Sequence, residues 1–409
     1  MCLFIICNSS LAQTYYISNC GTVITTPGNY YLTTNLDNTG NTSPCITINS
    51  TGSGAVLLQC QGYSISDSGT GSSIPKLLYA YNSPNAAWTG CRISYPNWST
   101  AVSPPVGVQI LNSYVVETGN SYKNIVVQGL SSTGLNLMNG DYYNSTLVLS
   151  NCNGSYVYHN SFHNFGSYSA SAAIHSVGSA YATFDDNAIV GGANMAYGIQ
   201  TSSMTAHVTI TNNTISGIYN GSNWGNGLDD GIEVEFVDTT SHTAGDQYSI
   251  NGNIISNVYD ACIEFYGRFT YPTVKNNSCT NPGEDGISGY YYLSLDHLDM
   301  ENNSLSVTTY TSGGPFAFIA DSSSVSWGAF LTNSTISGNT MSVVAGYGYN
   351  TQSALGNYTS SYSFWTFYGN TVTNNDLGTF FYSQNSSGVT DGGLNRCTYT
   401  VPAGALVCH

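Results

Sequence analysis

An asparagine-centred turn recurs through most of this chain and constrains its fold more than any other feature. From residue 125 onward the turns fall at Asn160, Asn187, Asn213, Asn253, Asn277, Asn303, Asn339 and Asn370. The steps between them are 27, 26, 40, 24, 26, 36 and 31 residues. Asparagine tolerates the left-handed backbone of tight turns, and stacked asparagine amides hydrogen-bond to one another. The repeat therefore predicts a solenoid in which each coil holds three short strands and three turns.

Two other repeat folds do not fit this pattern. Leucines do not recur at a fixed offset, which excludes a leucine-rich repeat, and a propeller blade needs a longer and steadier period. In a parallel β-helix, insertions of variable length lie in the turns at little thermodynamic cost. Roughly ten to twelve coils spaced by ~4.8 Å predict a rod about 50–60 Å long.

The opening of the chain carries a resemblance to a known family. Residues 13–65 hold four short β-type motifs, which are Ile17-Ser18-Asn19-Cys20, Pro27-Gly28-Asn29-Tyr30-Tyr31-Leu32, Cys45-Ile46-Thr47-Ile48 and the run from Val56 to Ile65. In this order they resemble the opening of secreted right-handed parallel β-helix proteins. These are the pectate-lyase-like superfamily, including surface β-helix repeat proteins of the periplasmic copper-binding accessory type. The family's usual Asp in the last motif is replaced here by Gln59-Cys60-Gln61.

The resemblance implies an all-β, single-stranded right-handed parallel β-helix with an N-terminal cap. We expect residues 13–65 to form the cap and first rungs, and residues 66–387 to form the β-helix with its loop insertions. Residues 388–409 leave the repeat and are expected to form a disulfide-stapled capping hairpin. Residues 1–12 are read as a signal peptide, because an apolar run precedes Ser10-Leu11-Ala12. The sequence contains no Met/His/Cys cluster that would support copper binding.

Cysteines and glycosylation motifs both point to secretion. Nine of the 11 cysteines follow the signal, and in a secreted chain we expect disulfides. The expected pairs are Cys20 with Cys45, Cys60 with Cys91, Cys262 with Cys279 and Cys397 with Cys408, leaving Cys152 free. The sequence has no C-x-x-C spacing of the kind that indicates a zinc site. Asn-x-Ser/Thr sequons are candidate glycosylation sites, at Asn41, Asn49, Asn97, Asn144, Asn153, Asn212, Asn220, Asn276, Asn302, Asn333, Asn357 and Asn385.

Charge excludes some partners. Six basic residues against 22 acidic ones give a net charge of −16, so the surface repels nucleic acid and anionic membranes. After the signal, no stretch approaches the ~18 apolar residues of a membrane helix, so we expect no membrane insertion.

The repeat also predicts which side chains face outward. If Ile174, Ile199, Ile232, Ile263 and Ile287 form one inward column, the next residue on each rung points outward. These outward residues are His175, Gln200, Glu233, Glu264 and Ser288. Thirteen of the 22 acidic residues lie between Asp229 and Glu301, accompanied by only Arg268 and Lys275.

Three interpretations of this acidic cluster stay open. It is a solvated stripe, a cation site or a set of catalytic acids. Ca²⁺ accepts carboxylate oxygens in flexible numbers, and its candidate ligands are Asp229, Asp230, Asp260, Glu284 and Asp285. The candidate catalytic acids are Glu233, Glu264, Asp229 and Asp260, with the two glutamates near the ~5 Å separation of a retaining glycosidase.

The preferred hypothesis is an extracellular structural or adhesive protein, glycosylated and self-assembling into homo-oligomers or filaments. It requires no cofactor. Only 7% of residues are charged, and abundant tyrosine supplies contact area in interfaces. The alternatives are a secreted polysaccharide-active enzyme, hydrolase or lyase, and a viral fibre that binds glycans. The companion motifs of known β-helix hydrolases and lyases are missing, and scarce basic residues favour a neutral glycan.

Overall fold

The protein is described here as a computed structural model. It describes residues 13–69, 74–98, 104–164, 172–191, 196–203, 207–218, 227–236, 245–309, 316–321, 330–345, 353–358, 366–368, 370–373, 380–383, 389–396, 399–401 and 407. The expected signal peptide and the expected Cys397–Cys408 pair lie outside these residues.

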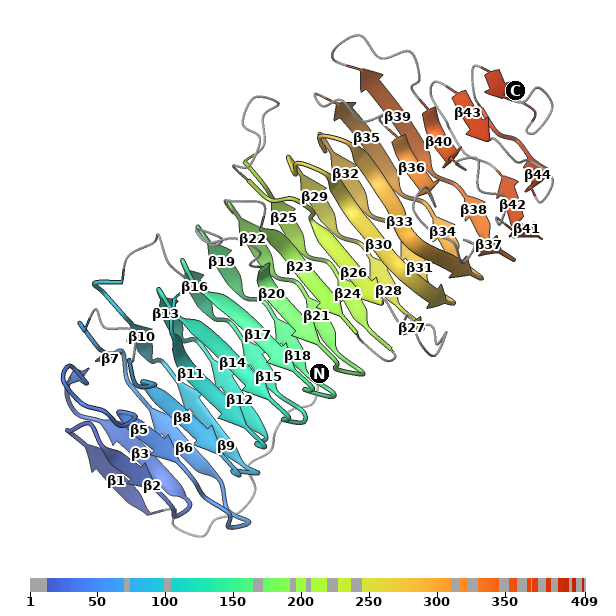
Figure 1. The fold of residues 1–409 in the computed structure, drawn as a ribbon. Helices are drawn as coiled ribbons and strands as arrows, with labels where there is room; N and C mark the ends of the chain where they lie inside the picture. The colour runs from blue at the N-terminus through green and yellow to red at the C-terminus, as the bar shows by residue number, and fades with distance from the viewer. Residues whose placement is uncertain are drawn as a thin grey trace.

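The chain coils through three sheets, and every strand pairing between neighbouring coils is parallel. Figure 1 shows the coils stacked along one axis into a rod, with the first rungs in blue at one end and the last in red at the other. Each strand pairs with its equivalents one coil earlier and one coil later. This confirms the predicted coil of three strands and places backbone hydrogen bonds along the rod.

The first sheet contains β1 (Thr14–Ile17), β3 (Gly28–Leu32), β6 (Val56–Gln59), β9 (Ala86–Thr89), β12 (Val115–Thr118), β15 (Asn136–Met138), β18 (Tyr156–Tyr158), β21 (Thr183–Asp185), β24 (Thr209–Thr211), β28 (Ser249–Asn251), β31 (Thr273–Lys275), β34 (Asp299–Glu301), β38 (Thr335–Ser337), β42 (Asn370–Thr373) and β44 (Val389–Gly393). The second sheet contains β4 (Leu36–Asp37), β7 (Ser64–Ser66), β10 (Arg92–Ser94), β13 (Ser121–Lys123), β16 (Asp141–Tyr143), β19 (Ser161–His163), β22 (Ala188–Val190), β25 (Thr214–Ser216), β29 (Ile254–Ser256), β32 (Ser278–Thr280), β35 (Ser304–Thr309) and β39 (Thr340–Ala345).

The third sheet carries most of the acidic cluster. Its strands are β2 (Thr22–Ile24), β5 (Ile46–Ile48), β8 (Leu78–Tyr81), β11 (Val106–Leu111), β14 (Val126–Leu130), β17 (Thr146–Ser150), β20 (Ala172–Val177), β23 (Tyr197–Ser202), β26 (Ile232–Phe236), β27 (Gly245–Asp246), β30 (Ala261–Thr270), β33 (Asp285–Asp296), β36 (Phe316–Asp321), β37 (Phe330–Thr332), β40 (Ser353–Tyr358), β41 (Thr366–Tyr368), β43 (Phe380–Ser383) and β45 (Tyr399–Val401).

The core lies inside the coil and is built from stacked columns of like side chains. The predicted isoleucine column is confirmed, because the register pairs its five members in successive rungs, and each is at most 1% exposed: Ile174, Ile199, Ile232, Ile263 and Ile287. Side chains alternate between the two faces of a strand, so the residue after each isoleucine faces away from the core.

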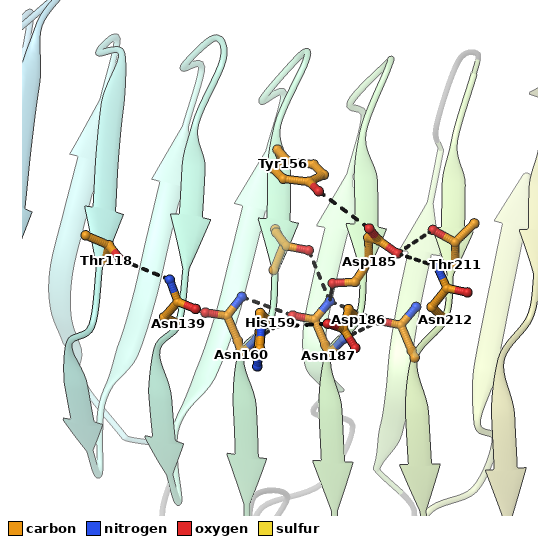
Figure 2. A network of polar contacts seen from close by, with 12 residues as sticks. Thr118, Asn139, Tyr156, His159, Asn160, Asp185, Asp186, Asn187, Thr211 and Asn212 are labelled. Atoms are coloured by element: carbon orange, nitrogen blue, oxygen red, sulfur yellow. Dashed lines mark hydrogen bonds and ion pairs between the residues drawn. The ribbon is translucent and has the colours of Figure 1, made fainter. Parts of the chain in front are cut away.

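The asparagine turns form a buried ladder between the first and second sheets. Asn187 donates from Nδ2 to Asn213 Oδ1 at 2.9 Å, and Asn213 donates in the same way to Asn253 at 2.9 Å. The ladder joins Asn160, Asn187, Asn213, Asn253, Asn277, Asn303 and Asn339, and Figure 2 shows the step from Asn160 to Asn187. The predicted amide stack is therefore present.

The left-handed backbone of these turns lies one residue earlier than predicted. Asp186, Asn212 and Gly252 have φ values of 53°, 56° and 69°, and each directly precedes a ladder asparagine. Two residues thus share the turn: the first adopts the left-handed conformation, and the second supplies the amide. The ladder asparagine itself needs its carboxamide rather than its tolerance of positive φ.

Three disulfides match the predicted pairs. Cys20 bonds to Cys45, Cys60 to Cys91 and Cys262 to Cys279. Cys152 is a buried free thiol, as predicted. The first two bonds join neighbouring coils near the N-terminal end, where fewer rungs support the fold.

Glu117 is a buried carboxyl inside the core that the sequence analysis missed. It is 1% exposed and accepts hydrogen bonds from Trp88 Nε1 at 3.0 Å, Tyr122 OH at 2.5 Å and Tyr142 OH at 3.0 Å. Burial raises its pKa to about 6, and the three donors oppose that rise. The buried Glu117 carboxylate is tolerated without a counter-ion because protein donors replace the hydrogen bonds that it would make to water.

Two sequence predictions concern the surface. Among the described residues, no helix is both long and apolar enough to span a membrane. Asn144 is 4% exposed and donates from Nδ2 to Asn124 Oδ1, so this sequon cannot carry a glycan without breaking the turn. Glycosylation at the other sequons stays a prediction.

Candidate functional site

The candidate site within the acidic cluster is built from two neighbouring rungs of the third sheet, β26 and β30. Strand pairing places Glu233 of β26 beside Glu264 of β30, with Gln200 of β23 one rung earlier and Ser288 of β33 one rung later. This outward column is the predicted one. Asp230 lies in the turn before β26, on the same rung as Glu233.

Three carboxyl groups converge in this cluster. One oxygen from each of Asp230, Glu233 and Glu264 lies within 4.8 Å of the other two. Asp230 is 1% exposed, whereas Glu233 and Glu264 are each 8% exposed. We call these three residues the carboxyl trio. The two glutamates are thus the members that retain contact with solvent.

Hydrogen bonds fix the orientation of the trio. Gln200 donates from Nε2 to Glu233 Oε1 at 2.7 Å, and Tyr197 also hydrogen-bonds to Glu233. Asp230 Oδ1 accepts a bond from the backbone N–H of Ala261 at 2.9 Å. The carboxyl groups of Asp230 and Glu264 also lie close enough to interact, and a hydrogen bond between them requires that one of the two is protonated, because two carboxylates have no donor.

The pKa values of the trio are all raised. Burial raises the pKa of Glu233 to about 7, and the Gln200 bond opposes that rise. Burial likewise raises the pKa of Glu264 to about 7, against the bond from Asp230. The pKa of Asp230 lies well above its ordinary range, because of burial and then the charge of Glu264. Glu233 and Glu264 therefore exchange protons near neutral pH, where an ordinary glutamate stays ionised.

The neighbouring acids only partly match the predicted cation site. Asp260 N–H donates to Asp229 O, and Glu284 N–H donates to Asp260 O, so these three residues lie on successive rungs. Burial raises the pKa of Asp229 to about 6 and that of Asp260 well above its ordinary range. The trio that could hold a metal contains Asp230 but joins it to Glu233 and Glu264.

Two buried oxygens beside the trio have no hydrogen-bond partner. They are Asp229 Oδ1 and Asp260 Oδ1, on adjacent rungs. An unsatisfied buried polar atom costs about 1–3 kcal/mol, so each of these two oxygens calls for a partner such as a water molecule or an ion. A proton, a ligand hydroxyl or a cation would satisfy both.

Among the described residues, basic side chains do not neutralise the trio. Lys275 pairs instead with Asp299 at 2.5 Å and with Glu301 at 3.1 Å. In the described part of the chain, no ion pair joins a lysine or arginine to a member of the trio. Protonation or a bound cation must then limit the repulsion between the carboxyls.

The trio should make the fold less stable as pH rises. Glu233 and Glu264 have folded pKa values of about 7, above the ordinary 4.5, so folding favours their protonated forms. Their stabilising contribution is complete below pH 4.5 and is lost as pH rises through about 7, with a total effect of a few kcal/mol.

This pH dependence can be measured by denaturant unfolding in chelator-containing buffer at pH 4.5 and pH 8. We expect the wild type to lose more stability between the two values than the Glu233→Gln/Glu264→Gln double variant. Identical losses in both proteins would refute the raised pKa values.

Comparisons with known proteins concern the fold. No family model matches this chain, and no curated protein matches it. Among solved structures, the mannuronan C-5 epimerase AlgE6 A-module of Azotobacter vinelandii has a TM-score of 0.47 at 15% identity, covering 94% of this chain and 91% of that chain. The periplasmic alginate epimerase AlgG has a TM-score of 0.43 at 10% identity, covering 93% of this chain and 76% of that chain. Tailspike protein 3 of bacteriophage CBA120 has a TM-score of 0.38 at 12% identity, covering 92% of this chain and 57% of that chain.

This chain is a parallel β-helix. In this β-helix, sequence reasoning found the column of Glu233 and Glu264 but missed two contacts. Asp230 was expected only among the Ca²⁺ ligands, yet its carboxyl group lies beside Glu264 on the next rung. Tyr197 was missed as well, although it begins the strand that carries Gln200. Counting only residues directly opposite one another hides such diagonal contacts.

Proposed function

We propose that this β-helix is a secreted glycoside hydrolase that cleaves a neutral polysaccharide with retention of configuration. The observation that carries the proposal is the carboxyl trio, whose oxygens lie within 4.8 Å of one another, with no ion pair to a lysine or arginine among the described residues. Retaining glycosidases place two carboxyl groups about 5 Å apart, whereas inverting ones need about 6.5–9.5 Å. The spacing of Glu233 and Glu264 therefore supports retention.

The surroundings of the two glutamates support different roles. Gln200 and Tyr197 both donate to Glu233, and donated hydrogen bonds stabilise its ionised form. Glu233 is thus the nucleophile. Glu264 hydrogen-bonds to Asp230, and this pair holds a shared proton. Glu264 is the general acid because it is the more exposed member of that pair.

The reaction takes place in two balanced steps. Glu264 gives its proton to the glycosidic oxygen while the Glu233 carboxylate bonds to the anomeric carbon, so the C–O bond to the leaving sugar breaks. Water then attacks that carbon, Glu264 takes a proton from the water, and the bond to Glu233 breaks. Two inversions give net retention.

Charge indicates the substrate class. The chain has a net charge of −16, and 13 of its 22 acidic residues lie between Asp229 and Glu301, the stretch of sequence that contains the trio. An anionic glycan would approach against this charge, with only Arg268 and Lys275 in the same stretch of sequence to bind its carboxylates. A neutral glycan avoids both costs.

The test is reducing-end release from a panel of neutral polysaccharides, including β-1,4-glucan, β-1,3-glucan, α-1,3-glucan, mannan and xylan. The first-formed anomer is then followed by proton NMR on any substrate that is cleaved. We expect retained configuration at the new reducing end. Inverted product would contradict the assigned roles, and no release from any glycan would contradict the proposal.

A cation site at the trio is the second candidate. Two ligands of one Ca²⁺ lie at most about 5 Å apart, because each Ca–O distance is about 2.4 Å, and the trio meets this limit. The expected ligands would then be Asp230, Glu233 and Glu264. Calorimetric titration with Ca²⁺ after chelator treatment separates the two candidates, because stoichiometric binding that depends on both glutamates supports the cation.

The sequence-based hypothesis of a self-assembling, glycosylated filament stays a prediction, as does secretion. Negative-stain electron microscopy before and after chelator treatment tests assembly. Ordered polymers would support a structural role, and strictly monomeric rods at high concentration would count against it.

A further inference from the structure

A hollow of about 560 Å³ lies on the side of the rod, at the turns between the third and first sheets. Its lining comes from β24, β28, β31 and the turns before them, with residues His207, Thr209, Gln247, Tyr248, Ser249, Tyr271 and Thr273. Tyr271 directly follows β30, about seven residues beyond Glu264, or roughly 20 Å of extended chain. The hollow is therefore distinct from the carboxyl trio.

A ladder of flat side chains borders the hollow. Each member stands two residues before a paired position of the first sheet and has a φ between 53° and 59°: Tyr181, His207, Gln247, Tyr271 and His297. The rings of Tyr181 and His207 stack with centroids 4.8 Å apart, and those of Tyr271 and His297 stack at 4.6 Å. The ladder therefore contains two stacked ring pairs.

The two pairs are separated by one rung that has no ring. Gln247 occupies that rung, and its amide donates sideways to Asp246 at 3.4 Å. His207 and Tyr271 are thus two rungs apart, about 9.6 Å, which leaves room for one flat ring between them at ordinary stacking distances. The hollow lies at this rung, where Gln247 stands in place of a ring.

Polar groups line the floor beside this rung. Thr209, Ser249 and Thr273 are paired in register on successive strands, and each is partly exposed. Ligand sites of about 300–1,000 Å³ combine such apolar walls with a few polar groups that fix orientation. Tyr271 itself is 54% exposed and Tyr181 is 61% exposed, so the stacked rings face solvent.

We propose that this hollow is a carbohydrate-binding subsite for a neutral glycan, with one pyranose ring held between His207 and Tyr271. The C–H faces of the sugar pack on the two rings, and its hydroxyls bond to the threonine and serine hydroxyls and to the Gln247 amide. The two nearby carboxyl groups already have partners. Asp246 accepts a hydrogen bond from Gln247, and Asp296 pairs with His297 at 3.1 Å. A neutral ligand matches this lining better than an ionic one.

The test measures binding alone, on Glu264→Gln protein, so that hydrolysis does not interfere. The probes are cellohexaose, mannohexaose, xylohexaose and maltohexaose, titrated by calorimetry. Tyr271→Asn removes the ring and keeps a residue suited to positive φ. Gln247→Tyr instead places a ring in the empty rung. Tyr143→Asn is the matched control, because Tyr143 is exposed in the second sheet.

We expect at least one probe to bind, and both Tyr271→Asn and Gln247→Tyr to weaken its binding at least tenfold. Tyr143→Asn should bind as the parent does. The inference is overturned if no probe binds below 10 mM, or if both variants at the hollow bind like the parent. A loss of binding here with intact hydrolysis, or the reverse, separates this subsite from the proposed reaction at the trio.

Discussion

Glu264→Gln is expected to lower the rate of glycan hydrolysis about a thousandfold or more. General acid catalysis by a positioned side chain contributes about 10²–10⁴ to the rate, and an amide cannot donate the proton that leaves with the sugar oxygen. Glu233→Gln should cause a loss of similar size, because the amide cannot form the covalent bond to the anomeric carbon. Reducing-end release under substrate saturation measures both effects.

Glu235→Gln provides the matched control for these two variants. Glu235 lies two residues after Glu233 on β26, so it faces the same way, but it is not a member of the trio. We expect its activity to stay within about twofold of the wild type. Equal losses of hydrolysis rate in all three variants would indicate a general effect of the acidic face. They would contradict the roles assigned to Glu233 and Glu264.

Asn253→Ala is expected to destabilise the fold by about 3 kcal/mol or more. Asn253 Oδ1 accepts bonds from the backbone N–H and from Nδ2 of Asn213, at 3.0 and 2.9 Å. Its own Nδ2 donates to Ile210 O at 2.9 Å and to Asn277 Oδ1 at 3.0 Å. Alanine leaves two buried donors without partners, each costing about 1–3 kcal/mol.

Amide hydrogen exchange at Asn213 and Asn187 shows where this loss acts, and denaturant unfolding gives its size. Asn257→Gly is the control, because Asn257 is partly exposed, has a φ of 55° and lies on the same coil. The glycine keeps the turn and removes an amide outside the ladder. An Asn253→Ala protein as stable as this control would show that the ladder contributes nothing.

The sequence predicted the coil because its signals repeat at every rung. Isoleucine in five successive rungs fixed the inward column, and its neighbours Glu233 and Glu264 followed from the alternation of side chains. Cys60 and Cys91 also lie about one coil apart in the sequence, as a bond between neighbouring coils requires.

Features that occur once in the repeat could not be predicted in this way. Glu117 interrupts an apolar column, and only the three-dimensional arrangement shows that Trp88, Tyr122 and Tyr142 surround it. The bond between Asp230 and Glu264 crosses between two columns, so counting offsets along one column missed it.

The ring ladder was also missed, although its members share one offset. Tyr181, His207 and Tyr271 each stand two residues before a first-sheet strand position. Their residue types differ from rung to rung, so they give no repeat signal until the strand pairing is known.

A carboxyl NMR titration tests the central claim most directly, because it needs no knowledge of the substrate. The side-chain carboxyls of glutamate are labelled with carbon-13, and Glu233→Gln and Glu264→Gln assign the two resonances. We expect the carboxyl groups of Glu233 and Glu264 to titrate near pH 7 in chelator-treated protein. Midpoints near the ordinary 4.5 for both residues would show a solvated acidic stripe and contradict the proposed chemistry.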